Sequence, residues 1–110
     1  MAARIARGDV RLHQFSSPDR RRPVVVLTRD SSIGHLATVT VAPITSSYRG
    51  VKSEVSLNED DGMKGPCAVN LHNAITAMPS RLGRRVAQLG SRRMGEICAA
   101  LQFALGCDLR

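Results

Sequence analysis

The sequence predicts a mainly β fold with one helix (class α+β): a small, strongly curved antiparallel sheet or barrel of five to six short strands, followed by a C-terminal amphipathic helix. Three observations predict it. Short β-branched apolar runs recur up to residue 89, turn-forming residues separate them, and apolar residues at helical spacing begin only after Gly90. The chain has 110 residues, of which 43% are hydrophobic, so we expect one domain spanning residues 1–110.

The expected strands follow two patterns. The run 23–27 is continuously apolar, as in a strand buried on both faces, and Pro23 is tolerated only at its start or at an edge. In contrast, apolar and polar residues alternate over 37–45 and again over 51–57, which indicates strands with one face in water. Three further short strands are expected at 10–15, 67–71 and 84–89.

One long helix is expected between Ser91 and Gly106. Ser91 is a favourable N-cap, Gly106 is well placed to end the helix, and Gly95 is expected to permit close packing within it. Its apolar residues recur at helical spacing: Met94, Ile97, Cys98, Leu101, Ala104 and Leu105. We expect loops at 16–21, 30–34 and 58–62, and one helical turn at 78–83.

The charge balance predicts a polyanionic partner. The formal net charge is +7, and arginines greatly outnumber lysines. Arginine suits two-point contacts with phosphate, so RNA, DNA or an acidic protein segment is expected to bind. A GC-rich genome would also favour arginine. Aromatic residues make up only 3% of the chain, which argues against a broad aromatic platform for stacked bases.

Neither a metal site nor a cofactor is expected. Three cysteines are too few and too scattered for a disulfide framework, so we expect reduced thiols: Cys67, Cys98 and Cys107. The three histidines lack metal-ligand spacing: His13, His35 and His72. No apolar run approaches the roughly 20 residues of a membrane span, so the protein is expected to be soluble and intracellular, without membrane contact.

Polar residues mark one end of two apolar runs. Arg22 precedes the run 23–27, and the run 41–44 is followed by Thr45, Ser46 and Ser47. If the two strands pair antiparallel, the start of one meets the end of the other. A fixed cation then lies beside hydroxyl groups at one sheet edge, an arrangement suited to holding a phosphodiester. Taken alone, the hydroxyl cluster also fits an ordinary turn after a strand.

In order along nearly the whole chain, these segments resemble the MazF/PemK/Kid family of toxins from bacterial toxin–antitoxin pairs. The resemblance rests on Arg7-Gly8-Asp9-Val10, on 21–27 and 41–46, and more weakly on 75–82 with the strand and helix expected after it. It implies an SH3-like antiparallel β-barrel of the MazF/CcdB type and a homodimer in the bacterial cytoplasm. It also implies a cognate antitoxin, whose acidic, largely disordered C-terminal segment the positive charge would attract.

The resemblance further implies a metal-independent, sequence-specific endoribonuclease that cleaves single-stranded RNA, expected to be mRNA, and inhibits translation and growth. Such cleavage uses the 2′-OH of the RNA and leaves a 2′,3′-cyclic phosphate and a 5′-OH. Arg22 matches the catalytic arginine of the family and Thr45 its catalytic threonine, while Ser46 and Ser47 are further candidates for catalysis or RNA binding. An arginine is a poor general base, because its pKa is above 12.

The chain departs from the family pattern where many relatives carry an arginine, because Ile75 stands there. The group that transfers protons is therefore open. His13 is a candidate substitute acid or base, although a lone histidine is more often structural. Candidate contacts with the RNA backbone, which also fit a solvated basic face, are Arg20, Arg21, Arg49 and Lys52.

Two other function classes fit parts of the sequence. CcdB-like toxins share the barrel but poison DNA gyrase without cleaving RNA, and the pairing of Arg22 with Thr45 disfavours this class. A passive, basic SH3-like module that binds nucleic acid is the other alternative, and the scarcity of aromatic residues weakens it.

Overall fold

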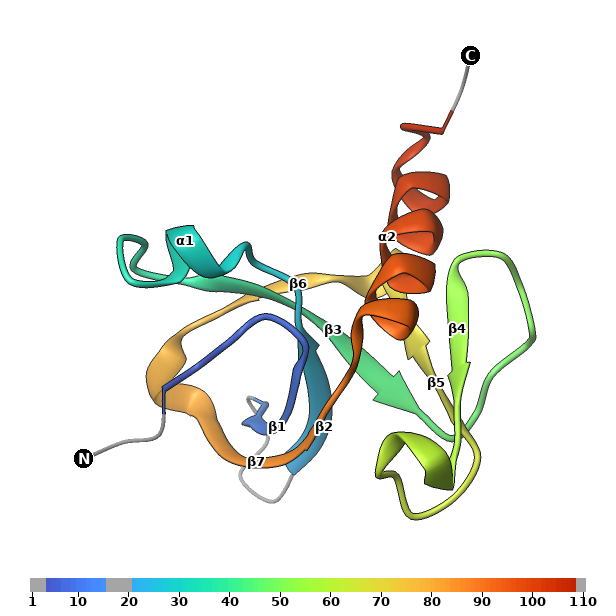
Figure 1. The fold of residues 1–110 in the computed structure, drawn as a ribbon, viewed down its shortest axis with the longest axis horizontal. Coiled ribbons are helices and arrows are strands. Elements are labelled where there is room, and N and C mark those ends of the chain that lie inside the picture. Colours follow the sequence, from blue (N-terminus) through green and yellow to red (C-terminus); the bar gives the residue numbers. More distant parts are fainter. Residues whose placement is uncertain (1–3, 16–20, 109–110) are drawn as a thin grey trace.

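The computed structural model describes residues 4–15 and 21–108 (Figure 1). This part of the chain holds seven strands: β1 (Asp9–Gln14), β2 (Arg21–Val26), β3 (Val39–Thr45), β4 (Glu54–Leu57), β5 (Cys67–Asn70), β6 (Ile75–Ala77) and β7 (Leu82–Gln88). It also holds the helices α1 (Asp30–Ile33) and α2 (Ser91–Leu105), with 3₁₀ turns η1 (Glu59–Asp61), η2 (Leu71–Asn73) and η3 (Pro79–Arg81). The predicted class, mainly β with α, is confirmed.

The strands form one antiparallel sheet in the order β4-β5-β3-β2-β1-β7, with β6 paired to β3 beside this path. The end strands β4 and β7 are not paired with each other in the described part of the chain, so the sheet is strongly curved but open. The structure has seven strands where five to six were expected. The strand missing from the prediction is β6, which has only three residues and is defined by its pairing with β3.

Strand β2 lies at the centre of the core, as its continuous apolar sequence predicts. Val24, Val25 and Val26 are fully buried, and they alternate between two clusters. Val25 joins the larger cluster, which extends to Ile97 on α2. The smaller cluster lies on the other face of β2 and consists of Val24, Val26, Val39, Val41 and Ala77.

Helix α2 packs on the sheet through one apolar stripe. Met94, Ile97 and Ala100 are buried, and the helix ends at Gly106, whose φ of 75° is left-handed. Two details correct the sequence predictions. The N-cap is Gly90 rather than Ser91, because the Gly90 carbonyl already accepts the first helical hydrogen bond, from the Met94 N–H (3.0 Å). Gly95 lies on the exposed face, where a side-chain methyl would meet nothing within 4 Å.

Local hydrogen bonds explain the other differences from the predicted elements. Residues 51–53 form a turn, because the Glu54 carboxylate accepts the backbone N–H groups of Arg49, Gly50 and Val51 at 3.0, 2.8 and 3.2 Å. The segment 30–34, expected as a loop, contains the short helix α1. The acidic turn 58–62 contains η1, which is capped by Asn58. Within the described residues, no helix has the length and apolarity that a membrane span requires.

Candidate functional site

Strands β2 and β3 bring the two polar strand ends to the same edge of the sheet. They pair antiparallel, with Val26 opposite Val41 and Val24 opposite Pro43. Arg22 lies two residues before Val24, near the start of β2, and Thr45 lies two residues after Pro43, at the end of β3. The antiparallel pairing expected from the sequence is therefore confirmed. From Ile44 onward β3 pairs with β5, so Thr45 lies where β3 passes from one neighbour to the other.

Strand alternation puts the two side chains on one face. Residues two apart in a strand share a face, so Arg22 follows Val24 and Val26, and Thr45 follows Val41. Those valines belong to the smaller cluster, so Arg22 and Thr45 lie at the margin of this apolar cluster. Arg22 is exposed and makes no ion pair or hydrogen bond to other described residues, which leaves its guanidinium available for an anion.

The Thr45 hydroxyl is already oriented. It accepts a hydrogen bond from the Ser47 N–H at 3.0 Å and lies 3.1 Å from the Ser47 carbonyl oxygen, to which it donates. Ser46 and Ser47 follow as exposed residues. The Glu54 carboxylate fixes the next part of the loop by accepting the backbone N–H groups of residues 49–51. The loop after β3, which carries these hydroxyls, is therefore fixed at one end by the Thr45–Ser47 hydrogen bonds and at the other by Glu54.

His13 lies directly opposite Arg22 in the β1–β2 pair, so their side chains share a face. The imidazole is only 6% exposed, its Nδ1 has no hydrogen-bond partner among the described residues, and its ring meets Phe15 edge-on with 4.5 Å between centroids. Burial lowers the pKa of His13, and the positive charge of Arg81 lowers it further. A neutral, buried imidazole therefore lies opposite the exposed guanidinium of Arg22.

The remaining predicted site residues lie apart from this group or are shared with other contacts. Arg21 is exposed, and its Nε lies 3.3 Å from Gln14 Oε1. Arg49 is exposed in the loop after Thr45. Arg20 lies outside the described residues. Ile75 is exposed and stands opposite Val41, on the face that carries the polar edge.

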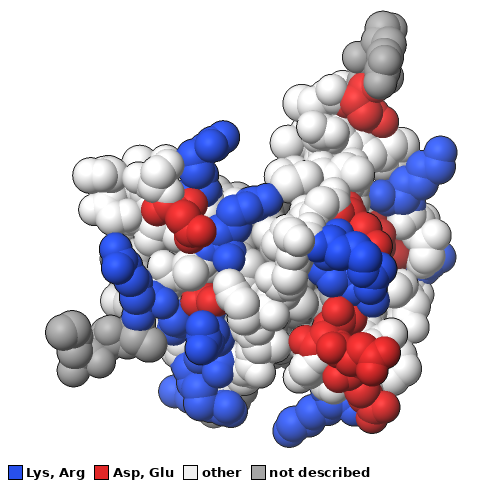
Figure 2. Space-filling view, viewed as in Figure 1, with Lys and Arg blue, Asp and Glu red and all other residues white. Residues whose placement is uncertain are grey.

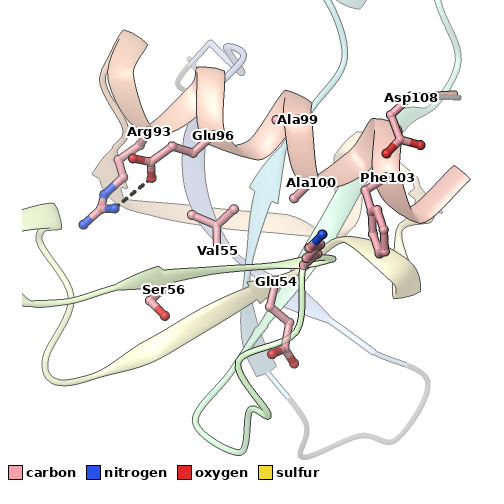
Figure 3. A pocket seen from close by; sticks show the side chains of 10 residues that line it. Glu54, Val55, Ser56, Arg93, Glu96, Ala99, Ala100, Phe103 and Asp108 are labelled. Carbon is pink, nitrogen blue, oxygen red and sulfur yellow. Dashed lines mark hydrogen bonds and ion pairs between the residues drawn. The ribbon is translucent and has the colours of Figure 1, made fainter. Parts of the chain in front are cut away.

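Lys52 lies in a different hollow, the α2 groove, between β4 and α2. This groove encloses about 560 Å³ and is lined by charges of both signs, including Glu54, Arg93 and Glu96 (Figure 3). Lys52 Nζ stands 5.8 Å from the centre of the Phe103 ring. Sequence reasoning did not find Arg81, whose effect on His13 depends on the approach of η3 to β1 and has no local signal.

Charge is distributed unevenly over the surface. Figure 2 shows basic side chains over both sides of this face; over the side that carries β1 and β7 they outnumber the acidic ones, whereas over the side of β4 and α2 they stand among the larger acidic groups. One acidic group of the chain is the turn at residues 59–61. The acidic turn is partly neutralised, since Arg93 makes a two-point contact with Asp61 at 2.9 and 3.1 Å. The open excess of positive charge therefore lies on the β1–β7 side.

Comparison with known proteins gives one family. The model for "PemK-like, MazF-like toxin of type II toxin-antitoxin system" matches residues 6–105. A curated relative, the probable endoribonuclease MazF5 of Mycobacterium tuberculosis, is 40% identical over 98% of this chain and 99% of its own length. The endoribonuclease MazF3 of the same organism is 36% identical over 82% of this chain and 87% of its own.

Solved structures agree with the fold. The Mycobacterium tuberculosis toxin MazF-mt6 superposes with a TM-score of 0.81 at 33% identity, over 89% of this chain and 96% of that one. A mycobacterial endoribonuclease, solved in complex with its cognate antitoxin, superposes with a TM-score of 0.86 over 97% of this chain and all of that one. At 23% identity, the second likeness supports the fold alone.

Proposed function

This chain belongs to the PemK-like, MazF-like toxins of type II toxin–antitoxin systems, and on that premise we propose that it is a sequence-specific endoribonuclease of single-stranded RNA. The observation that carries the proposal is the edge where Arg22 and Thr45 end neighbouring antiparallel strands on one face. The proposed target is mRNA, whose cleavage stops translation and growth. The curated relatives MazF5 and MazF3 bear the name endoribonuclease, which supports the same activity here.

The proposed reaction is a transesterification within the RNA. The 2′-oxygen attacks phosphorus, the bond from phosphorus to the 5′-oxygen breaks, and the products carry a 2′,3′-cyclic phosphate and a 5′-OH. Arg22 clamps the nonbridging oxygens as their negative charge grows. Thr45 exchanges its bond to the Ser47 carbonyl for one to the phosphate or the 2′-OH. Removing one such stabilising donor costs about 10²–10³ in rate.

We assign proton transfer to His13. Its lowered pKa keeps the imidazole neutral near pH 7, so it can accept the 2′-OH proton and later return it to the leaving 5′-oxygen. Its position opposite Arg22 supports this role. Ser46 and Ser47 add donors, and Arg20, Arg21, Arg49 and Lys52 are proposed to contact the RNA backbone.

The protein is proposed to act as one domain in a homodimer in the bacterial cytoplasm, inhibited by a cognate antitoxin with an acidic segment. The net charge of +7 favours both RNA and such a segment. The family model, described as a toxin of type II toxin-antitoxin systems, supports this kind of partner.

The test is cleavage of a long single-stranded RNA by the purified protein in EDTA, with the 5′ ends of the fragments mapped. Arg22→Ala and Thr45→Val are expected to lower the rate by about 10²–10³. Matched controls keep full rate: Arg29→Ala removes an exposed arginine before α1, and Thr40→Val removes an exposed hydroxyl from β3.

Full activity in Arg22→Ala and Thr45→Val would overturn the site. Absence of RNA cleavage by the wild-type protein, with inhibition of DNA gyrase instead, would replace the proposal with a CcdB-like activity. For His13, the measurement is the pH profile of kcat/KM. His13→Gln should remove the acidic limb of that profile, and an unchanged limb would leave His13 with a structural role only.

A further inference from the structure

A second basic hollow lies beside the edge strand β7. This β7 hollow encloses about 760 Å³; its apolar lining is Ile5, Pro79 and Leu82, and its polar lining includes Ser80, Arg84 and Arg85. None of the described residues that line it carries a carboxylate, whereas the α2 groove is lined by Glu54, Glu96 and Asp108 beside its cations (Figure 3). The β7 hollow therefore combines apolar surface with positive charge alone.

Among the described residues, the carboxylate of Asp9 neutralises only part of the positive charge in the hollow. The nearest carboxylate, Asp9, is fully buried and bound to Arg11 at 2.9 Å. Arg85 approaches Asp9 only to 3.8 Å and keeps 56% of its side chain exposed. Arg84 is exposed and forms no hydrogen bond or ion pair with the described residues. The Arg84 guanidinium is therefore available to an anion, and Arg85 still exposes more than half of its side chain while paired with Asp9.

Strand register connects the hollow to the cleavage site. In the row across β2, β1 and β7, Arg22 stands opposite His13 and His13 opposite Leu82. Two residues before His13 on the same strand, Arg11 stands opposite Arg85 of β7. Opposed residues share a face, so Arg85 lies on the same face as Arg22, two strand spacings away, or about 10 Å. The β1–β7 register shifts on both sides of Arg11, and Arg84, the neighbour of Arg85, also lines the hollow. The neighbouring nucleotides of a bound strand reach that far.

We propose that the β7 hollow binds a nucleotide of the RNA that flanks the cleaved bond, an inference that rests on the proposed endoribonuclease function. Arg84 and Arg85 bind the phosphate in two-point contacts, while the base lies on Ile5, Pro79 and Leu82 beneath a guanidinium plane. Unstacked bases of single-stranded RNA stack on aromatic rings or on arginine planes, and in this hollow an arginine supplies the plane. Ser80 supplies a hydroxyl that can bond to a base edge or a 2′-OH.

The test compares long and short RNAs that contain the same cleaved bond. The Arg84→Gln, Arg85→Gln double variant should raise KM for the long RNA about tenfold, because it loses two charged contacts that are partly screened. It should also lower the salt slope of binding by about 0.7, since the hollow neutralises one phosphate and each phosphate contact on a single strand contributes about 0.7. The advantage in kcat/KM of the long RNA over the short one should shrink accordingly.

A matched control removes two positive charges elsewhere. Lys64 and Arg92 are exposed, and Lys64→Gln, Arg92→Gln should retain the preference for long RNA. An unchanged KM in the Arg84, Arg85 double variant, with wild-type cleavage intact, would overturn this inference and leave the proposed function standing. The same conclusion follows if that variant loses affinity for a polyglutamate peptide but not for RNA.

If the wild-type protein does not cleave RNA, the proposed function fails first. Direct binding of the long RNA, measured by fluorescence anisotropy, then decides the inference separately. Tenfold weaker binding by the double variant would support the hollow as an RNA site, and equal binding would overturn it.

Discussion

Replacing Arg11 with methionine tests what the Arg-Gly-Asp-Val segment does in the folded protein. Arg11 is 4% exposed, and its Nε donates to Asp9 Oδ2 at 2.9 Å. Its other two nitrogens donate to the carbonyl oxygens of Gly83 and Arg4, each at 3.0 Å. One guanidinium therefore joins β1 to the start of β7 and to the N-terminal segment. Arg11→Met keeps most of the side-chain volume and removes all three bonds.

The structure gives the size of the effect. Asp9 is fully buried, and without Arg11 its carboxylate keeps a hydrogen bond from the Ala6 N–H and a distant approach by Arg85 at 3.8 Å. Removing one partner of a buried ion pair costs about 3–5 kcal/mol, because the other charge is left uncompensated. Arg85 compensates in part, so we expect a loss of about 3–4 kcal/mol in the free energy of unfolding.

The assay is urea unfolding at fixed protein concentration. With a slope of about 1–3 kcal/mol per molar for a small protein, the midpoint should fall by about 1 M or more. The Asp9→Asn, Arg11→Met double variant removes the stranded charge while keeping an acceptor for Ala6, and it should be more stable than Arg11→Met alone. A loss below about 1 kcal/mol, or a double variant no more stable than the single, would refute the reasoning.

Three further predictions concern stability. Gly95→Ala should raise the free energy of unfolding by about 1 kcal/mol, measured by urea denaturation, because the site is an exposed helix interior with room for a methyl. Burial and the charge of Arg81 lower the pKa of His13, so the unfolded chain binds a proton at His13 more readily than the folded protein does. The free energy of unfolding should therefore fall as the pH drops below about 6.5. His13→Gln should reduce this fall when the free energy of unfolding is compared between pH 8 and pH 5.5. Burial raises the pKa of Asp61, but hydrogen bonds from Arg93 and the Asn58 backbone lower this pKa on balance. Arg93→Met should therefore lower the free energy of unfolding by about 1–2 kcal/mol at pH 7. This difference from wild type, followed by thermal denaturation, should shrink as the pH falls below about 4 and Asp61 becomes protonated.

Features written in contiguous residues could be predicted from the sequence. The apolar run of β2 indicated a strand buried on both faces, and the helical spacing of Met94, Ile97 and Leu101 indicated α2. The polar ends of β2 and β3 indicated a shared edge, because antiparallel pairing needs only neighbouring strands. Each of these signals is local, or follows from one pairing.

Features that depend on distant contacts could not be predicted. Strand β6 has three residues and exists through its pairing with β3. The turn over 51–53 depends on one Glu54 oxygen, which overrides an alternating pattern typical of a strand. The neutral state of His13 depends on burial by the curved sheet and on Arg81, which is far away in sequence. The buried role of Asp9 and Arg11 was also invisible in a motif that reads as a turn.

Strand β3 pairs with two different strands along its length, so its two ends can move with different parts of the sheet. Its residues up to Pro43 pair with β2, while Ile44 and Thr45 pair with β5. Arg22 is therefore fixed to one half of the sheet, and Thr45 moves with the half that also carries β4 and supports α2. Any bending at residues 43–44 would open or close the gap between cation and hydroxyl. A molecule bound on α2 would thereby change the distance between Arg22 and Thr45, the proposed catalytic pair, without touching either of them.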